Sequence, residues 1–234
     1  MILAVHERIV REALGDILSV PALRVVIRAN RRSDLHQFAA ERHFDNAANP
    51  RALCDLWQRG LSAWLARAVA RCTPRDPAVT RLLDHRGSLA AFGLATHALA
   101  DFYAHTNWIE LAIARGESPQ MAPLLGSVCD PESFPPALQS GYFHPRHGLS
   151  GCPRAGPPPG FTYCHAQLNK DAPTRGHGAA RPVPGGPTYH DLAVQLAISS
   201  TRSSWDALCA RIRSAYGDGE LPERIIARLG NPPI

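Results

Sequence analysis

The stretch that decides the fold is Ala95-Thr96-His97-Ala98-Leu99-Ala100-Asp101-Phe102-Tyr103-Ala104-His105-Thr106-Asn107-Trp108-Ile109-Glu110. His97, Asp101 and His105 stand four residues apart, and a rotation of about 100° per residue puts them on one face of a helix. The surrounding residues are apolar almost all round, which predicts a helix over about residues 89–114 that is buried inside an all-helical domain. Because burying an unpaired charge is expensive, these side chains need partners. Metal ions would supply them, and Asp101 has two oxygens to share between two ions.

The composition indicates one globular domain over residues 1–234. The chain has 234 residues, 45% of them hydrophobic, and a formal net charge of +5, with Lys170 as its only lysine. This charge admits phosphate, a phospholipid headgroup or nucleic acid as a partner and selects none of them. The six cysteines form no CxxC pair, which excludes a zinc ribbon and a thioredoxin-like redox pair. Their even number permits disulfides, but Cys54, Cys72 and Cys209 lie in helical patterns and are expected to pack as small apolar groups.

Targeting signals are not evident in the sequence. The N-terminus shows no signal peptide, and no apolar run reaches the ~18 residues of a transmembrane segment. We therefore expect a soluble protein that is cytoplasmic or exported by a specialised route.

Helical periodicity recurs along most of the chain. In residues 3–18 an apolar stripe begins with His6, which is therefore expected to face inward as a hydrogen-bonded core residue or as a ligand. Further helices are expected over residues 50–70, 74–83, 188–216 and 221–229. His190 stands in the first turn of the last long helix, where it would either reach a neighbouring metal site or be exposed.

Residues 30–46 concentrate ligand-type side chains. Asp34, His36, His43 and Asp45 fall within twelve positions, and Ser33 or Asp34 can cap a short helix that ends near Arg42. A solvated surface helix and a metal-ligand segment are both compatible with this pattern.

Helical periodicity fails over residues 117–187. Nine of the chain's 21 prolines and eight of its 18 glycines lie between residues 144 and 187. Such a stretch is typical of an irregular insert, acting as a functional lid or remaining disordered. Within it, residues 161–171 read as an ordered island.

Ligand-type residues on several predicted helices form one constellation. Imidazole and carboxylate groups without thiolate favour zinc or a similar divalent ion. The members are His6, Asp34, His43, His97, Asp101, His105 and a late His190.

This pattern resembles the zinc-dependent phospholipase C and single-strand nuclease superfamily. The resemblance rests on the early His6-x-x-Ile9 helix, on Asp34 with His43-Phe44, and on the His97-x-x-x-Asp101-x-x-x-His105 motif. Residues 93–111, and the Cys-His-Ala-Gln-Leu-Asn-Lys-Asp segment that begins at Cys164, look most like Het-C heterokaryon incompatibility proteins and their bacterial relatives.

The resemblance implies an α-helical fold that holds two or three zinc ions. It would assign Asp34, His43, His97 and Asp101 to one ion and His6 with Asp101 to a second. A third ion would use His105, helped by His165 or His190.

The leading interpretation is a metal-dependent phosphodiester hydrolase, most like phospholipase C and acting in the manner of an antagonistic toxin or effector. Asp34 would orient or deprotonate the attacking water. Glu110 would serve as an acid/base or would be a paired surface carboxylate. A glycerophospholipid, with a membrane surface as partner, is preferred over nucleic acid because no basic strip with interleaved aromatic residues is visible.

Three alternatives stay open. The first is a Het-C-like membrane-active toxin or partner-binding protein whose metal cluster is structural and which has no turnover. The second is a nuclease, and the third is a helical bundle with incidental histidines.

Overall fold

The computed structural model describes residues 1–72, 84–150, 152–217 and 219–232. Within these ranges the regular structure is helical, and the only β-type pairings are two isolated bridges, Thr106 with Ser140 and Tyr142 with Cys164. The predicted all-α, multi-helix fold is confirmed. The longer helices are α1 (Leu3–Leu14), α2 (Val20–Ser33), α4 (Pro50–Trp57), α5 (Ala63–Cys72), α6 (His85–His105), α7 (Trp108–Ala114), α9 (Tyr189–Tyr216) and α10 (Glu220–Gly230). The shorter ones are η1 (Asp34–His36), α3 (Ala40–His43), η2 (Gln58–Ser62), η4 (Pro131–Ser133), η5 (Pro145–Ser150), α8 (His165–Leu168) and η6 (His177–Ala179).

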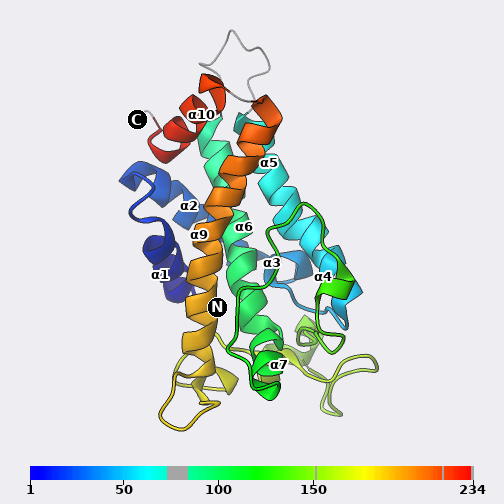
Figure 1. Cartoon of the computed structure of the whole chain (residues 1–234). Helices are drawn as coiled ribbons and strands as arrows, with labels where there is room; N and C mark the ends of the chain where they lie inside the picture. Colours follow the sequence, from blue (N-terminus) through cyan, green and yellow to red (C-terminus); the bar gives the residue numbers. More distant parts are fainter. Residues whose placement is uncertain (73–83, 151, 218, 233–234) are drawn as a thin grey trace.

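Helix α6 forms the centre of the molecule, with α2, α5 and α9 packed around it (Figure 1). Most of its side chains are buried, as the sequence predicts. The approach of α2 depends on Gly93, since a Cβ there would lie only 2.5 Å from the Val26 carbonyl oxygen. Towards α9, the rings of Phe92 and Trp205 meet edge to face with their centroids 5.6 Å apart. The central helix is therefore held rigidly from several sides.

The central helix ends earlier than the predicted boundary near Ala114. It stops at His105, Thr106 is extended, and α7 begins at Trp108. The Thr106 hydroxyl donates to the Phe102 carbonyl at 2.7 Å, and the Asn107 side chain accepts from the Gln139 backbone N–H. These side chains compete with the helical ladder, which explains the break.

Helix α2 is absent from the expectations drawn from the sequence. It begins after Ser19, has a proline in its first turn, and runs without interruption to Ser33. The helix expected from Ser33 or Asp34 to Arg42 is therefore wrong, because that stretch holds the end of α2, then η1 and α3. The first helix also stops at Leu14 and does not reach residue 18.

The helix expected over residues 50–70 is present as a continuous run of α4, η2 and α5. The Asn49 side chain caps it by accepting from the Ala52 N–H. Cys54 is not merely an apolar packing group, since it forms a disulfide with Cys129. Cys72 and Cys209 are buried and outside disulfides, as expected. The helix expected over residues 74–83 lies outside the described residues.

The long helix and short helix expected near the C-terminal end are confirmed as α9 and α10. Thr188 caps α9 through a reciprocal pair of hydrogen bonds with Asp191. No helix in the described part of the chain is long and apolar enough to cross a membrane.

The irregular segment 117–187 is tied to the helices at several points. The Trp57 indole N–H donates to the Leu124 carbonyl at 2.6 Å, and a second disulfide joins Cys152 to Cys164. The fully buried Lys170 ammonium donates to the Thr106 carbonyl and to Glu110. In its described part this segment is thus a docked layer over one end of α6.

Candidate metal centre

The three polar residues of the α6 motif lie at the end of α6 near α3 and the irregular segment. His97 and Asp101 are fully buried, and His105 is only 4% exposed. Two sets of side chains from other elements meet this face. We call His6, Asp34, His43, His97 and Asp101 the helix group, and Asp45, His105 and His165 the loop group.

In the helix group, two imidazoles meet at one oxygen of Asp101, and the Asp34 carboxylate lies beside one of them. Asp101 Oδ2 lies 2.8 Å from His43 Nδ1 and 3.1 Å from His97 Nε2. These two nitrogens are 3.3 Å apart, and Asp34 Oδ1 lies 3.7 Å from His97 Nε2. Asp34, His43 and His97 therefore form a set that could hold a metal ion.

The other oxygen of Asp101 faces His6. His6 Nε2 lies 3.2 Å from Asp101 Oδ1, and the imidazole stacks on that of His97 with centroids 4.1 Å apart. Neither ring nitrogen of this buried histidine makes a hydrogen bond within the described part of the chain. Since buried polar atoms are normally paired, a ligand such as a metal ion would explain the arrangement. His6, His97 and Asp101 form a second possible metal-binding set.

A cation is already accommodated beside Asp101. The Met1 ammonium donates to Asp101 Oδ1 at 2.6 Å and lies 2.9 Å from Asp171 Oδ1. Burial alone would lower the pKa of this amine, but the two carboxylates raise it to about 11. The two carboxylates thus stabilise a positive charge placed between them.

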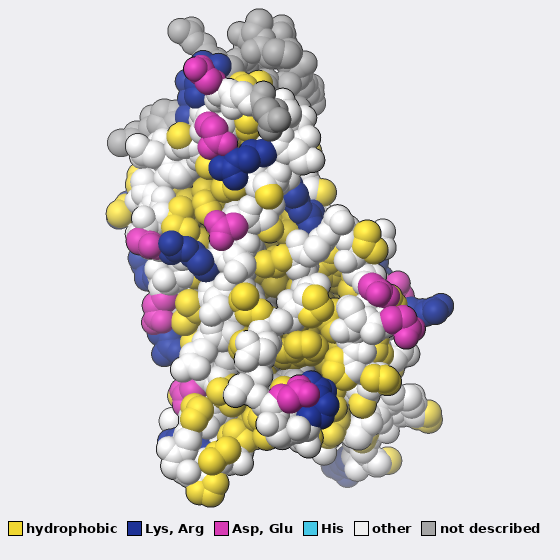
Figure 2. All heavy atoms as spheres, viewed as in Figure 1, with side chains coloured by type: hydrophobic (Ala, Val, Ile, Leu, Met, Phe, Trp, Pro, Cys, Tyr) yellow, Lys and Arg dark blue, Asp and Glu magenta, His cyan; other side chains and the backbone are white. Residues whose placement is uncertain are grey.

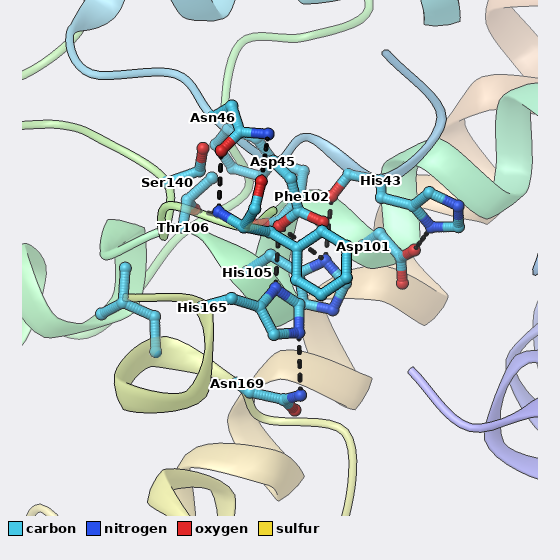
Figure 3. Close-up of polar contacts among 12 residues, drawn as sticks. His43, Asp45, Asn46, Asp101, Phe102, His105, Thr106, Ser140, His165 and Asn169 are labelled. Atoms are coloured by element: carbon cyan, nitrogen blue, oxygen red, sulfur yellow. Dashed lines mark hydrogen bonds and ion pairs between the residues drawn. The ribbon is translucent and has the colours of Figure 1, made fainter. Parts of the chain in front are cut away.

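The loop group lies at the His105 end of the motif, where Asp45 and His165 approach His105 (Figure 3). His165 Nδ1 lies 2.9 Å from Asp45 Oδ1, and His105 Nδ1 lies 3.6 Å from the same oxygen. The Asn169 amide donates to His165 Nε2 at 3.0 Å. Asp45, His105 and His165 form a third set that could hold a metal ion.

The backbone around Asp45 is unusual. Phe44 and Asn46 have φ values of 51° and 65°, in the left-handed region that non-glycine residues seldom adopt. The Asn46 side chain holds the turn by accepting from the Phe143 N–H and donating to its carbonyl. This strained turn directs His43 to the helix group and Asp45 to the loop group. Strained backbone conformations of this kind are common at ligand-binding sites.

His165 reaches the site because two backbone segments approach closely. A Cβ on Gly141 would lie 2.5 Å from the His165 Cα, and the neighbouring residues Tyr142 and Cys164 form a bridge. A side chain at position 141 would push α8 away from Asp45.

Electrostatics prepare His6, His97 and Asp101 for a cation. Burial lowers the pKa of His6 to about 3 and also lowers the pKa of His97, so both imidazoles are neutral near pH 7. Neutral imidazole is the form that binds a metal. Burial would raise the pKa of Asp101, but the Met1 ammonium holds it well below its usual range. Asp101 is therefore a buried carboxylate that stays ionised.

A cavity of about 670 Å³ opens onto both groups. Its polar lining consists of Asp34, Gln37, His43, Asp45, Asp101, His105, His165 and Asp171, and its apolar lining includes Ile2, Leu3, Leu35 and Phe143. On the face shown in Figure 2 no histidine reaches the surface, in agreement with the burial of most of the motif.

Two predicted site residues lie outside these sets. His190 is buried, and its Nδ1 lies 2.7 Å from the Lys170 carbonyl oxygen. Glu110 accepts a 2.7 Å hydrogen bond from Lys170 Nζ and lies 2.7 Å from His177 Nε2. Glu110 is thus a paired carboxylate, one of the two roles expected for it, and it belongs to none of the three sets that could hold a metal ion.

Sequence reasoning left two carboxylates out of the constellation. Asp45 is predicted only as one of the ligand-type residues of the segment 30–46, and Asp171 only as the end of the ordered island over residues 161–171. The available signals were the two-residue spacing of Asp45 from His43 and the presence of Asp171 in a segment too polar for a core. Asp171 Oδ1 lies 3.1 Å from His105 Nε2, so it links the loop group to the Met1 ammonium.

Fold and site together define an all-α protein with buried His and Asp groups that could hold metal ions. No family model matches the chain, and no solved structure matches it. Human von Willebrand factor A domain-containing protein 7 is 30% identical to it over 231 residues, a match that covers 89% of this chain. The chain spans only 23% of the length of that curated relative, so the similarity concerns one part of a larger protein.

Proposed function

We propose that the chain is a zinc-dependent phosphodiester hydrolase of the phospholipase C type. The observation that supports this most is the position of Asp101, whose Oδ2 faces His43 and His97 while Oδ1 faces His6. A buried carboxylate that offers its two oxygens to different imidazoles is suited to bridge two cations. Clusters of divalent ions recur in enzymes that cleave phosphoesters.

The donor set fits zinc. Imidazole nitrogens and carboxylate oxygens are common zinc ligands, and each possible set contains at least one histidine and one carboxylate. His6 Nδ1 and Asp34 Oδ2 are buried polar atoms that make no hydrogen bond in the described part of the chain, and a bound ion would compensate for this. The helix group would hold two ions through Asp101, and the loop group a third.

Ions bound here would supply an activated water and would neutralise phosphate oxygens. Among the chain's own residues, Asp34 is the candidate general base. It lines the cavity, its Oδ2 has no hydrogen-bond partner in the described part of the chain, and burial raises its pKa. A carboxylate with these properties accepts a proton more readily than a solvated one. We assign Glu110 a structural role, because Lys170 and His177 both bind its Oε1 and Glu110 belongs to none of the three possible metal-binding sets.

A glycerophospholipid suits the cavity better than a nucleic acid. Aliphatic side chains of Ile2, Leu3 and Leu35 line it beside the polar residues, and they offer a surface to a diacylglycerol moiety. Nucleic-acid sites instead place several large aromatic rings for base stacking, and Phe143 is the one Phe, Tyr or Trp among the described residues that line this cavity.

The test combines metal analysis with hydrolysis. We expect plasma emission to find two or three zinc ions per chain, and we expect turnover of phosphatidylcholine or bis(p-nitrophenyl) phosphate that a chelator abolishes. Asp101→Asn should lower the metal content and reduce kcat by about three orders of magnitude or more, because the bridging charge is lost.

A matched control is Asp206→Asn, which changes an exposed aspartate on α9. It should leave both the metal content and the turnover unchanged. Bound zinc without turnover would overturn the hydrolase proposal in favour of a structural cluster. Absence of any bound metal would overturn the metal centre itself.

A further inference from the structure

We infer that the surface formed by α1, α2 and η1 next to the cavity docks onto a bilayer that contains anionic phospholipid. The inference deepens the proposed function, since it names the surface on which the cavity would meet its substrate. Docking is measured without turnover, so the two proposals can fail separately.

The first feature of this surface is a groove lined by arginines. Its lining includes five arginines together with Leu3 and Leu35. Glu7 pairs with Arg11 at 2.8 Å and with Arg31 at 3.4 Å. Three exposed arginines stand at four-residue intervals on α2: Arg24, Arg28 and Arg32. Their guanidinium groups make no hydrogen bond or ion pair in the described part of the chain.

Exposed arginines elsewhere are often paired. Arg213 binds Glu223, and Arg115 binds Glu117 at 2.7 Å. Figure 2 likewise shows basic and acidic side chains next to each other on the face it presents. The α2 row therefore carries a positive charge that is not neutralised within the described chain, and this complements anionic headgroups.

The second feature is a set of exposed apolar side chains at the same place. Leu35 is 79% exposed and Phe38 is 75% exposed, while Ile2 and Leu3 are each about 40% exposed. Exposure of large apolar side chains to water is unfavourable, and their transfer to the interfacial region of a bilayer lowers the free energy. A nucleic acid would complement the arginines and could stack a base on Phe38, but it would not use the aliphatic side chains of Ile2, Leu3 and Leu35.

The third feature is continuity with the metal cavity. Leu3 and Leu35 line both the arginine groove and the cavity. A bilayer that contacts the arginine row and the apolar side chains would thus lie over the cavity mouth. This placement would deliver a lipid headgroup towards Asp34, which directly precedes Leu35.

The test is cosedimentation with vesicles of phosphatidylcholine alone or mixed equally with phosphatidylserine. It is run on the unchanged chain and on Asp101→Asn, which keeps the lipid intact. We expect binding to the mixed vesicles that weakens with added salt. The triple change Arg24→Gln, Arg28→Gln and Arg32→Gln should weaken binding by about a hundredfold, about fivefold for each arginine.

The matched control removes the same charge from the other side of α6. Arg51, Arg59 and Arg67 are exposed on the run from α4 to α5, away from α1 and α2 (Figure 1). Changing these three to Gln should weaken binding only a few-fold, whereas Leu35→Ser with Phe38→Ser should weaken it by tenfold or more. Circular dichroism verifies that each variant is folded.

Three outcomes would overturn the inference. One is a chain that binds neither kind of vesicle. Another is an equal loss of binding in the two arginine triples, since net charge alone would then explain it. The third is a single-stranded DNA oligonucleotide that binds the α2 arginines more tightly than the vesicles do, which would identify a nucleic-acid surface.

Discussion

The two halves of the candidate metal centre are built in different ways. The helix group draws its side chains mainly from α6 and from α1 and α3, which each pack against α6. The loop group joins the last residue of α6 to Asp45 in a strained turn and to His165 in the irregular segment. Packed helices fix side-chain positions through many contacts, whereas irregular segments depend on a few specific ones.

The two groups are therefore expected to respond differently to changes in the structure. The helix group is expected to keep its geometry as long as the core is folded. The loop group is expected to respond to any change that shifts residues 161–171 or the turn at Asp45. The predictions below separate these two behaviours, beginning with the largest effect.

The anchor of the irregular segment should be its most sensitive point. Lys170→Met removes one of the two partners of Glu110 and the donor to the Thr106 and Leu168 carbonyls. The Lys170 side chain is fully buried, so water does not replace these contacts. We expect a loss of about 3–5 kcal/mol in the free energy of unfolding, because Glu110 is left with less compensation. Urea denaturation measures this loss.

A double-mutant cycle supplies the control. Lys170→Met combined with Glu110→Gln should be less destabilised than the sum of the single changes, since no unpaired charge remains. Additive effects would contradict the coupling of this buried pair.

Removing one histidine from each half should remove metal from that half only. His6→Gln is expected to reduce zinc bound by the helix group, and His165→Gln to reduce zinc bound by the loop group. Each affinity should fall by at least about tenfold, a loss that even partners of metal ligands cause. Titration of zinc against a competing chelator distinguishes the classes of site. If both variants lose the same ions, the two halves form one cooperative site.

Two glycines allow a backbone test of the same contrast. Gly93→Ala would force α2 away from α6, and Gly141→Ala would force α8 away from its neighbour, because each new Cβ would lie 2.5 Å from a backbone atom. Each change should cost about 1–3 kcal/mol in stability. Only Gly141→Ala should leave the helix group's zinc affinity unchanged. An equal loss of affinity at both groups in that variant would show that the halves are not separable.

The smallest effect is expected at the exposed turn residue Asn46. Asn46→Gly tolerates the positive φ but loses the two hydrogen bonds to Phe143. We expect the free energy of unfolding to fall by about 1 kcal/mol or less, and we expect zinc to bind more weakly at the loop group. Thermal denaturation and the chelator titration measure these two quantities. A change confined to the helix group would contradict the assigned role of the turn.

Much of the helix group could be predicted from sequence. The four-residue spacing in α6 places His97 and Asp101 on one face, and the apolar stripe of α1 turns His6 inward. The structure bears out the burial of all three residues and brings them together. Local periodicity was sufficient because each of these residues lies on a regular helix.

Helix α2 escaped prediction for a local reason. Its residues include Val20, Val25, Val26 and Ile27, whose branched side chains lower helix propensity, and Pro21 stands near its start. Packing against α6 through Gly93 outweighs that preference. The exposed arginine row on α2 could therefore not be placed beside the cavity from the sequence.

The all-α class, the buried central helix and most of the ligand types can be predicted from the sequence, because helical periodicity and chemical identity are local properties. Only the tertiary structure decided that Asp45, His105, His165 and Asp171 meet, that Glu110 pairs with Lys170, and that His190 stays apart. These contacts join residues that are far apart in the chain through irregular backbone. Their formation depends on turn geometry and on packing between distant segments, which no periodic pattern encodes.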